Sequence, residues 1–275
     1  MAKIIWPNGA KCAVMLSFDV DGQCLGGKDE KGQSYPRSIS YGRYGPVRGV
    51  ERIVDILEAR DLPATFFVPA RTAVDFPSMF KDLDKAGYEI GHHGFDHELF
   101  SGLAYEQQEN IIDRSQEAFD HLIGKTAKVF RTPSGDFTKD TPRLLIDKGF
   151  IGSSSMRGDD RPYRTVIDGK ETDLIEMPPK WEMDDYPYFG YDFYPVKTLM
   201  QHRICSYDLV LDNWKREFDG CYKEGLMFIV MNHPQVIGRP GRSDVLRELI
   251  DYIRAHEDVW FTTAGDLANW WRENY

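Results

Sequence analysis

The chain is poor in cysteine, with four among 275 residues (Cys12, Cys24, Cys205 and Cys221), and no two of them form a CxxC pair. Such dispersed cysteines fit reduced thiols better than a disulfide framework or a structural zinc knot. Long apolar runs are also missing: nowhere do about eighteen apolar residues follow one another, and the N-terminal residues hold no apolar region with a cleavage site. We therefore expect a cytoplasmic protein without a membrane anchor.

Basic stretches are missing as well. The formal net charge is −10 at pH 7, which excludes nucleic acid and acidic lipid surfaces as partners. No linker, charge block or repeat marks a domain boundary. With 41% hydrophobic and 13% aromatic residues the chain can bury a sizeable core. We predict one domain over residues 1–275, with an elaborated loop at about 23–46 that is rich in Gly, Ser, Tyr and charge.

Apolar periodicity predicts strands that alternate with helices along the chain. The predicted strands cover 12–16, 64–68, 88–91, 128–131, 150–153, 173–177, 226–231 and 259–262. The predicted helices cover 46–60, 77–86, 105–123, 140–148, 207–223 and 243–256. About seven or eight βα units favour an α/β fold with a parallel sheet, closed or nearly closed into a barrel. An open doubly wound sheet is the alternative.

Two histidines four residues apart follow the predicted strand 88–91, in His93-Gly-Phe-Asp-His97. Neutral imidazole is a good ligand for zinc and its first-row neighbours, and this spacing brings both rings to one side of a turn. The alternative is an ordinary buried or surface histidine pair.

Two aspartates two residues apart close the first predicted strand, in Ser17-Phe-Asp-Val-Asp21. Asp19 and Asp21 share a face of the strand, where like charge and desolvation are unfavourable unless a cation or a proton lies between the carboxylates. The alternative is an Asp-rich turn, which Gly22 supports.

Polar residues follow several predicted strands at their C-terminal ends. They are Asp19 and Asp21, His93 and His97, Arg131, Trp181 and Asp184, and His233. In a parallel barrel those ends meet on one face, where active sites are built. We therefore expect these side chains to form one site.

The motifs Phe18-Asp-Val-Asp21, His93-Gly-Phe-Asp-His97, Arg131-Thr-Pro-Ser-Gly135 and Asn232-His-Pro234 resemble, in this order, those of the NodB-type polysaccharide deacetylases, also called carbohydrate esterase family 4. The segment Asp173–Trp181 and the long loop after the first strand are similar to a cytoplasmic branch of that family. That branch holds a peptidoglycan deacetylase-like protein of Helicobacter, cyclic imide hydrolases and allantoinase-like enzymes.

The resemblance implies a distorted (β/α)7 barrel with one divalent metal, zinc or another first-row ion, bound by Asp21, His93 and His97. It further implies that Asp19 is the general base, oriented by Arg131. The chain departs from the family where Val20 separates the aspartates and where Gly-Phe-Asp replaces a Ser/Thr-containing step between the histidines. Three protein ligands leave coordination positions open, which is the pattern of a catalytic rather than a structural site.

His233 is the predicted acid for the leaving nitrogen, provided that a carboxylate raises its pKa, and Asp184 and Asp185 are both candidates for that carboxylate. We predict that Asp184, Asp185 and Trp181 contact the substrate. The aromatic segment Tyr186–Tyr194 either lines the substrate site or packs against a neighbouring subunit. We expect a homo-oligomer, a dimer or a tetramer.

The predicted function is metal-dependent hydrolysis of a non-peptide amide, removing the N-acetyl group from an amino sugar. The alternative is a hydrolase of a cyclic amide or imide, imidase-like or allantoinase-like, acting on a small heterocycle. A cytoplasmic location favours a soluble substrate over a polymer outside the membrane. An Fe(II) oxygenase shares the ligand set of two His and one carboxylate, but it needs neither Asp19 nor His233. A catalytically inactive binding barrel does not explain why the motifs are intact.

Overall fold

The computed structural model describes residues 4–25, 31–32, 35–190 and 205–275. These residues group into two compact units. The first unit contains Met1–Val14, Phe18–Leu62 and Lys180–Phe261, and the second contains Met15–Ser17, Pro63–Pro179 and Thr262–Tyr275. Strand β1 (Cys12–Asp19) therefore contributes residues to both, and every one of its residues is buried.

The second unit carries six strands in the order β6-β7-β5-β4-β3-β2, namely Tyr163–Ile167, Lys170–Glu176, Gly152–Ser153, Val129–Phe130, Glu89–His92 and Thr65–Val68. Helices between them are α3 (Ala70–Asp75), α4 (Pro77–Lys85), α5 (Tyr105–Ile123) and α6 (Thr141–Asp147), and α10 (Ala264–Asn274) follows near the end of the chain. β-branched and aromatic residues account for the strands, and a buried apolar stripe with the C-terminal cap Gly124 accounts for α5.

The register of this sheet positions functional side chains. His92 pairs with Val68 on one side and with Phe130 on the other, and Phe130 in turn pairs with Ser153. Because these strands are parallel, the residues that follow them leave the sheet at one level. His93 and Arg131 are therefore neighbours although they are distant in sequence.

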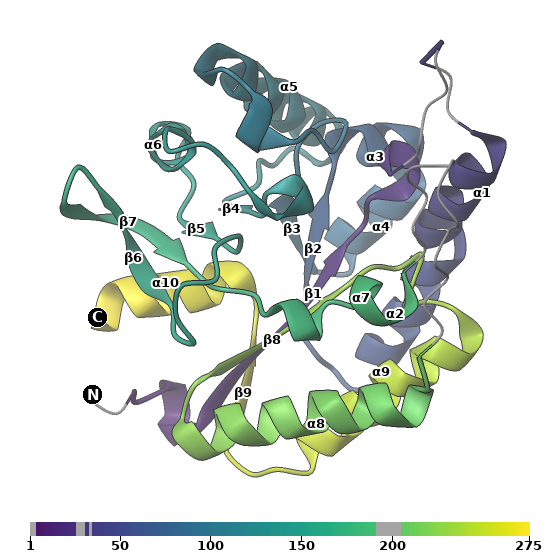
Figure 1. The fold of residues 1–275 in the computed structure, drawn as a ribbon, viewed down its shortest axis with the longest axis vertical. Helices are drawn as coiled ribbons and strands as arrows, with labels where there is room; N and C mark the ends of the chain where they lie inside the picture. The colour runs from purple at the N-terminus through teal and green to yellow at the C-terminus, as the bar shows by residue number, and fades with distance from the viewer. Residues whose placement is uncertain (1–3, 26–30, 33–34, 191–204) are drawn as a thin grey trace. The chain divides into compact units, whose positions relative to one another are not determined.

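The first unit contains β8 (Met227–Asn232) and β9 (Val259–Thr262), both paired with β1. Its longer helices are α1 (Pro36–Tyr44), α2 (Val50–Glu58), α8 (Tyr207–Glu224) and α9 (Pro240–Arg254). Short helical turns cover Pro7–Gly9, Gly22–Cys24, Trp181–Met183 and α7 (Tyr186–Phe189), and a π-helical turn covers Gly45–Gly49. Helices α8 and α9 lie side by side (Figure 1), and the Tyr252 hydroxyl of α9 donates to Asp219 of α8 at 2.8 Å.

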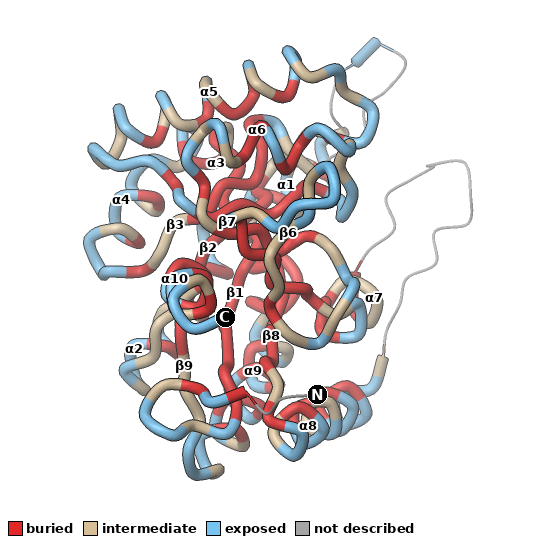
Figure 2. The backbone as a smooth tube through the Cα atoms, turned by 90° about the vertical axis from the view of Figure 1, so that its left-hand side faces the viewer, coloured by how far each residue is buried: buried red, intermediate tan, exposed pale blue. Residues whose placement is uncertain are grey.

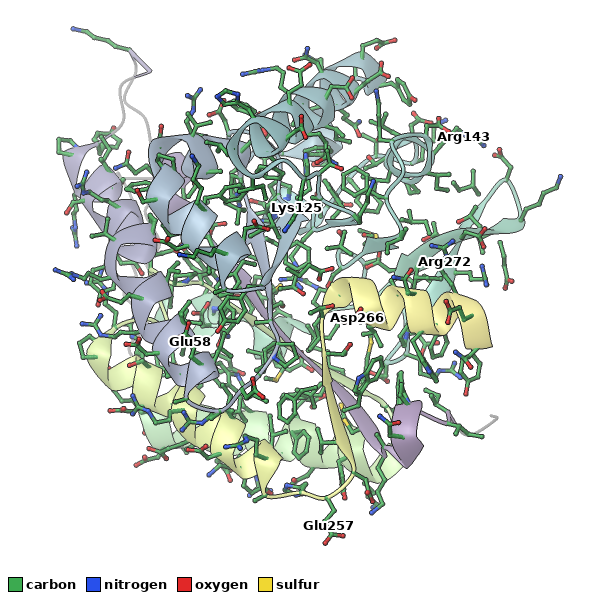
Figure 3. All side chains as sticks on the ribbon, turned by 180° about the vertical axis from the view of Figure 1, so that it is seen from behind. Glu58, Lys125, Arg143, Glu257, Asp266 and Arg272 are labelled. Carbon is green, nitrogen blue, oxygen red and sulfur yellow. The ribbon has the colours of Figure 1, made fainter. Side chains whose placement is uncertain are left out.

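Burial follows the apolar pattern of the sequence. Most strands run through the buried parts of each unit, with β6 as an exception, whereas the helices expose their outer faces (Figure 2). Charged side chains such as Arg143 and Glu257 project outward from the ribbon (Figure 3). None of the helices in the described ranges is both long and apolar enough to cross a membrane.

Most predicted elements are confirmed within one to three residues at their ends. Helices α3 and α10 were not predicted, and two further expectations are wrong. Strand β6 was not predicted, and it pairs with β7 in an antiparallel hairpin rather than extending a parallel sheet. The turn Asp168-Gly169 has φ values of 52° and 77°, which is the backbone that a two-residue hairpin turn requires. The other error concerns the predicted loop at 23–46, which is helical over Pro36–Tyr44, where Pro36 at the first helical position starts α1.

Candidate functional site

Asp19 and Asp21 lie at the C-terminal end of β1 in the first unit, and both are buried. Asp19 is the last residue of the strand, and Asp21 begins the short turn Gly22–Cys24. The Nε2 amide of Gln235 donates to Asp21 Oδ2 at 3.0 Å. Both carboxylates are therefore buried at this strand end, although Asp21 lies just beyond the strand, and their predicted roles stay predictions.

His233 follows β8 and pairs with Asp185. Its Nδ1 lies 2.7 Å from Asp185 Oδ1, and its backbone N–H donates to Asp185 Oδ2 at 3.0 Å. Asp184 Oδ1 is farther from the same Nδ1, at 3.6 Å, and accepts the backbone N–H of Tyr186 at 2.8 Å. The sequence left Asp184 and Asp185 as equal candidates, and the structure assigns Asp185 as the direct partner of His233.

This pairing depends on where the segment after β7 runs. A parallel bridge joins Asp184 to Met231 of β8, and the Asn232 side-chain amide donates to the carbonyl of Met183 at 3.2 Å. These contacts hold Asp185 beside the residue that follows β8.

The charges around His233 determine its protonation. Its Nε2 lies 3.9 Å from Asp19 Oδ2 and 3.8 Å from Asp21 Oδ2. Burial by itself would lower the pKa of His233, but the negative charges of Asp185 and Asp184 raise that pKa to about 10. Burial raises the pKa of Asp184 to about 7 despite the opposing effect of His233. The imidazole is therefore held in its protonated form by its carboxylate neighbours.

The same residues contain a possible metal-binding group, because ligand atoms of Asp184, Asp185 and His233 all lie within 4.8 Å of one another. However, the 2.7 Å contact between His233 Nδ1 and Asp185 Oδ1 has the length of a charge-assisted hydrogen bond. We interpret this group as a histidine with its orienting carboxylate. The Nε2 atom then carries the exchangeable proton on the side of Asp19 and Asp21.

Tyr186 and Gln235 complete this cluster. Tyr186 begins the aromatic segment that was a candidate for the substrate site, whereas Gln235 was not predicted. The Tyr186 ring meets the His233 ring edge-on, with centroids 4.5 Å apart, and Gln235 Nε2 donates to the Tyr186 hydroxyl at 3.3 Å. Burial raises the pKa of Tyr186 well above its usual value. Two positions in the sequence could have indicated these residues: Tyr186 directly follows Asp185, and Gln235 lies two residues after His233.

The other residues of the predicted aromatic segment behave differently. Tyr188 packs on Trp214 and Phe189 packs on Tyr207 inside the first unit, while residues 191–194 lie outside the described ranges. Trp181 has a side chain that is 55% exposed, in contrast to the buried cluster around His233. Its contact with substrate stays a prediction.

His93 and His97 belong to the second unit and follow β3. Their ring centroids are 4.9 Å apart, and the rings are inclined at 77°. His93 Nδ1 lies 2.7 Å from the carbonyl oxygen of Arg131. When Nδ1 donates its hydrogen there, the lone pair of Nε2 is the ligand atom, which is the usual arrangement of metal-binding histidines.

Arg131 is buried rather than a surface arginine. Its Nε donates to the carbonyl of Ser154 at 3.1 Å, and its Nη2 donates to the hydroxyls of Ser17 and Ser154 at 3.0 and 2.9 Å. The guanidinium also lies over the Phe67 ring, 4.2 Å from its centroid. Its predicted role toward Asp19 is untested by these contacts and stays a prediction.

Glu176 is a buried carboxyl group that the sequence reasoning missed. It ends β7 and accepts the backbone N–H groups of Ser155 at 2.6 Å and Met156 at 2.9 Å. Burial raises the pKa of Glu176 to about 7, against the effect of these hydrogen bonds. The signal was its place at the C-terminal end of a strand, which it shares with Asp19.

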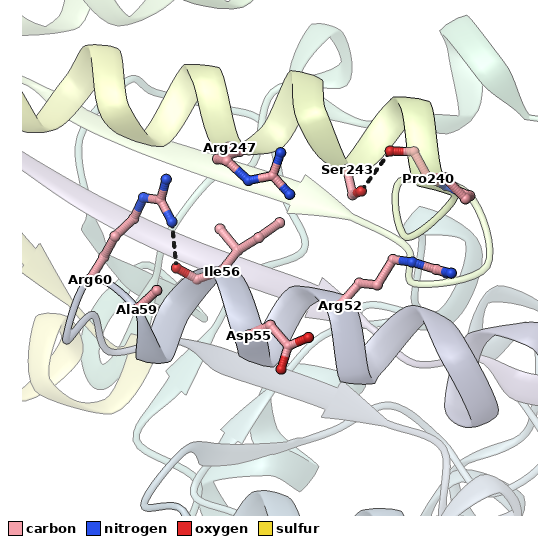
Figure 4. Close-up of a pocket in the computed structure, with 8 residues that line it drawn as sticks. All are labelled: Arg52, Asp55, Ile56, Ala59, Arg60, Pro240, Ser243 and Arg247. Atoms are coloured by element: carbon pink, nitrogen blue, oxygen red, sulfur yellow. Dashed lines mark hydrogen bonds between the residues drawn. The ribbon is translucent and has the colours of Figure 1, made fainter.

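None of the predicted site residues lines either of the two described cavities. One of about 340 Å³ lies between α2 and α9 in the first unit (Figure 4). Its lining includes Arg52, Asp55, Arg60, Ser243 and Arg247.

Comparison with known proteins identifies a family and several relatives that this chain resembles. The profile of a family described as polysaccharide deacetylase matches residues 43–151. The chain is 27% identical to the peptidoglycan deacetylase of Helicobacter pylori, over 93% of this chain and 95% of that protein.

Among solved structures, a protein of Mycobacterium smegmatis assigned as a polysaccharide deacetylase is 31% identical, with a TM-score of 0.88 over 99% of this chain and 94% of that chain. The Puue allantoinase has a TM-score of 0.86 at 24% identity, over 100% of this chain and 95% of that chain, which shows a shared fold alone. The predicted α/β fold class is confirmed by these structures.

Proposed function

This chain belongs to the polysaccharide deacetylase family, and we propose that it is a metal-dependent hydrolase that removes the N-acetyl group from an amino sugar. Membership rests on the Mycobacterium smegmatis relative, 31% identical across 99% of this chain. The NodB-type fold and the enzyme class, a hydrolase of carbon–nitrogen bonds other than peptide bonds, follow from that membership.

Asp21, His93 and His97 would hold one divalent metal, zinc or another first-row ion. Their chemistry fits this role, because a carboxylate and two neutral imidazoles form the donor set of an open catalytic site. The hydrogen bond from His93 to the Arg131 carbonyl, 2.7 Å long, orients one of these imidazoles as a ligand. A bound metal supplies Lewis acidity, which makes water more acidic and the amide carbonyl more electrophilic.

The residues of this chain move the protons. Asp19 takes a proton from the attacking water, and Arg131 orients Asp19. His233 donates the proton on Nε2 to the leaving nitrogen, so that the amide and water become acetate and an amine. Asp185 holds Nδ1 at 2.7 Å and thereby aims Nε2 toward the carboxylates of Asp19 and Asp21.

The observation that carries this proposal is the pairing of His233 with Asp185 at 2.7 Å, with its Nε2 facing the carboxylates of Asp19 and Asp21. Acid catalysis of nitrogen departure uses a histidine oriented and kept protonated in this way. We propose that Asp184, Asp185 and Trp181 lie along the path of the substrate.

We further propose that the enzyme acts in the cytoplasm, on a soluble amino sugar, as a dimer or a tetramer. Light scattering coupled to size exclusion measures the subunit count directly. A monomer at micromolar concentration would contradict the oligomer.

The test is a hydrolysis screen of N-acetylated amino sugars and their oligomers against hydantoins, succinimides and allantoin, with and without a chelator. We expect acetate release that stops with chelator and returns with zinc. His93→Ala should lose both bound metal and activity. His256→Ala is the matched control, since His256 is not among the predicted site residues and contacts the Tyr252 carbonyl at 2.9 Å and the rings of Phe218 and Tyr222. Turnover of a cyclic imide without acetate release would replace the proposed substrate, and purified protein without stoichiometric metal would remove the proposed mechanism.

A further inference from the structure

The loop that carries both predicted histidine ligands has an unusual backbone. Gly94 has a φ of 73°, and His97 has a φ of 59°, a left-handed conformation that is costly for a residue with a side chain. A side chain at position 94 would also collide, because a Cβ there would lie 2.9 Å from Glu98 Oε2. Contacts elsewhere must therefore hold His97 in place.

Part of that support comes from backbone hydrogen bonds. The first amides of α3, those of Ala70 and Arg71, donate to the carbonyls of Gly94 at 3.1 Å and Phe95 at 2.9 Å. The backbone N–H of Phe95 donates to Glu98 Oε2 at 2.9 Å, which closes the loop around His97.

The Phe95 side chain provides a second support. It is buried, and the guanidinium groups of Arg71 and Arg114 lie over its ring, 5.2 and 4.1 Å from the centroid. Arg71 also donates to Asp96 Oδ1 at 2.9 Å, so one arginine engages two successive loop residues. Cation–π contacts of this kind are directional as well as attractive.

Beyond Phe95 the packing is open. A cavity of about 640 Å³ borders Phe95 and Arg114 and is also lined by Val74, Pro77 and Leu122. No neighbour fills the space if the ring is cut back, so the position of the loop depends on the ring itself.

We propose that Phe95, held by cation–π contacts with Arg71 and Arg114, is a positioning residue that sets the geometry of His93 and His97 for metal binding. This inference rests on the proposed function, since it assigns Phe95 a role toward the metal that the two histidines would hold.

Metal affinity tests the inference. Zinc affinity is measured by competition with a chromophoric chelator for Phe95→Leu, Arg114→Gln and Arg114→Lys. We expect Phe95→Leu and Arg114→Gln to weaken zinc binding by about tenfold, the effect of removing a residue that orients a metal ligand. Arg114→Lys, which keeps the cation, should weaken it by less than about threefold. Arg143→Gln is the matched control, because Arg143 is an exposed arginine of the same unit that pairs with Asp168.

Two further measurements separate positioning from general stability. The visible spectrum of the cobalt-substituted protein should change in Phe95→Leu but not in Arg143→Gln, because it reports ligand geometry. In the double variant of Phe95→Leu with Arg114→Gln, zinc binding should be no weaker than in Phe95→Leu alone, since both changes break one contact. Unchanged zinc affinity and an unchanged cobalt spectrum in Phe95→Leu would overturn the inference.

The wild-type protein distinguishes this failure from failure of the proposed function. If the wild type binds no zinc, the proposed function fails. The positioning role of Phe95 is then tested by NMR spectroscopy of the metal-free protein. In that state the Cε1–H resonances of His93 and His97 should shift or broaden in Phe95→Leu and stay unchanged in Arg143→Gln. Resonances that match the wild type in Phe95→Leu would refute the positioning role.

Discussion

Replacing Asp185 by Asn should lower the pKa of His233 and so limit its action as an acid at alkaline pH. Asp185 contacts the imidazole at 2.7 Å and the His233 backbone N–H at 3.0 Å, and it is the largest factor that raises the His233 pKa to about 10. Against the usual value of about 6.5, this shift corresponds to roughly 4 to 5 kcal/mol in favour of the protonated form. Without the charge of Asp185, burial lowers the pKa of His233, and the smaller effects of Asp184 and Asp21 oppose it. We expect a fall of at least about two units.

The direction of the His233 pKa shift determines the pH range in which the two proteins should differ. A folded-state pKa above the unfolded value stabilises the protein below pH 6.5, and that stabilisation is lost as the pH rises through about 10. In the wild type, kcat should therefore stay high until His233 loses its proton at alkaline pH. In Asp185→Asn, the decline in kcat should begin at least about two pH units lower. A fall of two units would leave roughly one-tenth of the imidazole protonated at pH 9, so we expect kcat at pH 9 to fall by at least about tenfold. Both proteins are compared in the same metal state.

Asp184→Asn is the matched control, because Asp184 lies 3.6 Å from the same nitrogen and makes no direct hydrogen bond to it. Its effect on the His233 titration, followed by the Cε1–H resonance, should be the smaller of the two. The reasoning is refuted if Asp185→Asn leaves the His233 titration and the alkaline limb within half a unit of the wild type.

Three further predictions concern stability. Burial raises the pKa of Glu176 to about 7, so the wild type should lose up to roughly 3 kcal/mol of stability as the pH rises from 4.5 to 7. Glu176→Gln should remove that loss, and urea unfolding that shows the same pH dependence in both proteins would contradict it. Gly49→Ala would place a Cβ 2.0 Å from the Pro234 carbonyl, next to His233, so we expect a loss of several kcal/mol and lower activity, checked by thermal unfolding and acetate release. Gly265→Ala would place a Cβ 2.3 Å from Glu89 Oε1, which accepts the Gly265 N–H at 3.0 Å, and calorimetry should show a lower melting temperature. An unchanged melting temperature there would mean that the Glu89 carboxyl group moves aside without cost.

Local patterns predicted the elements whose side chains follow a strict period. The helix α5, with its apolar stripe and Gly124 cap, and the buried β8 were both predictable, because propensity and burial agree over many consecutive residues. Helix α1 was missed because it is short and polar with a glycine near its end. Hairpin strand β6 was missed because its residues are mostly half-exposed and show no clear alternation.

The sequence by itself determined approximately where the strands end, and hence that Asp19, His93, Arg131 and His233 are candidate site residues. Strand ends can be predicted in this way because they depend on the pattern of residues close together in the sequence. Only the tertiary structure decided that Asp185 rather than Asp184 orients His233, 48 residues away, since that choice depends on a bridge between two distant segments. It likewise decided that Arg131 is buried on Ser17 and Ser154. Adjacent residues have nearly identical local signals, and only the folded chain brings one of them within hydrogen-bonding distance.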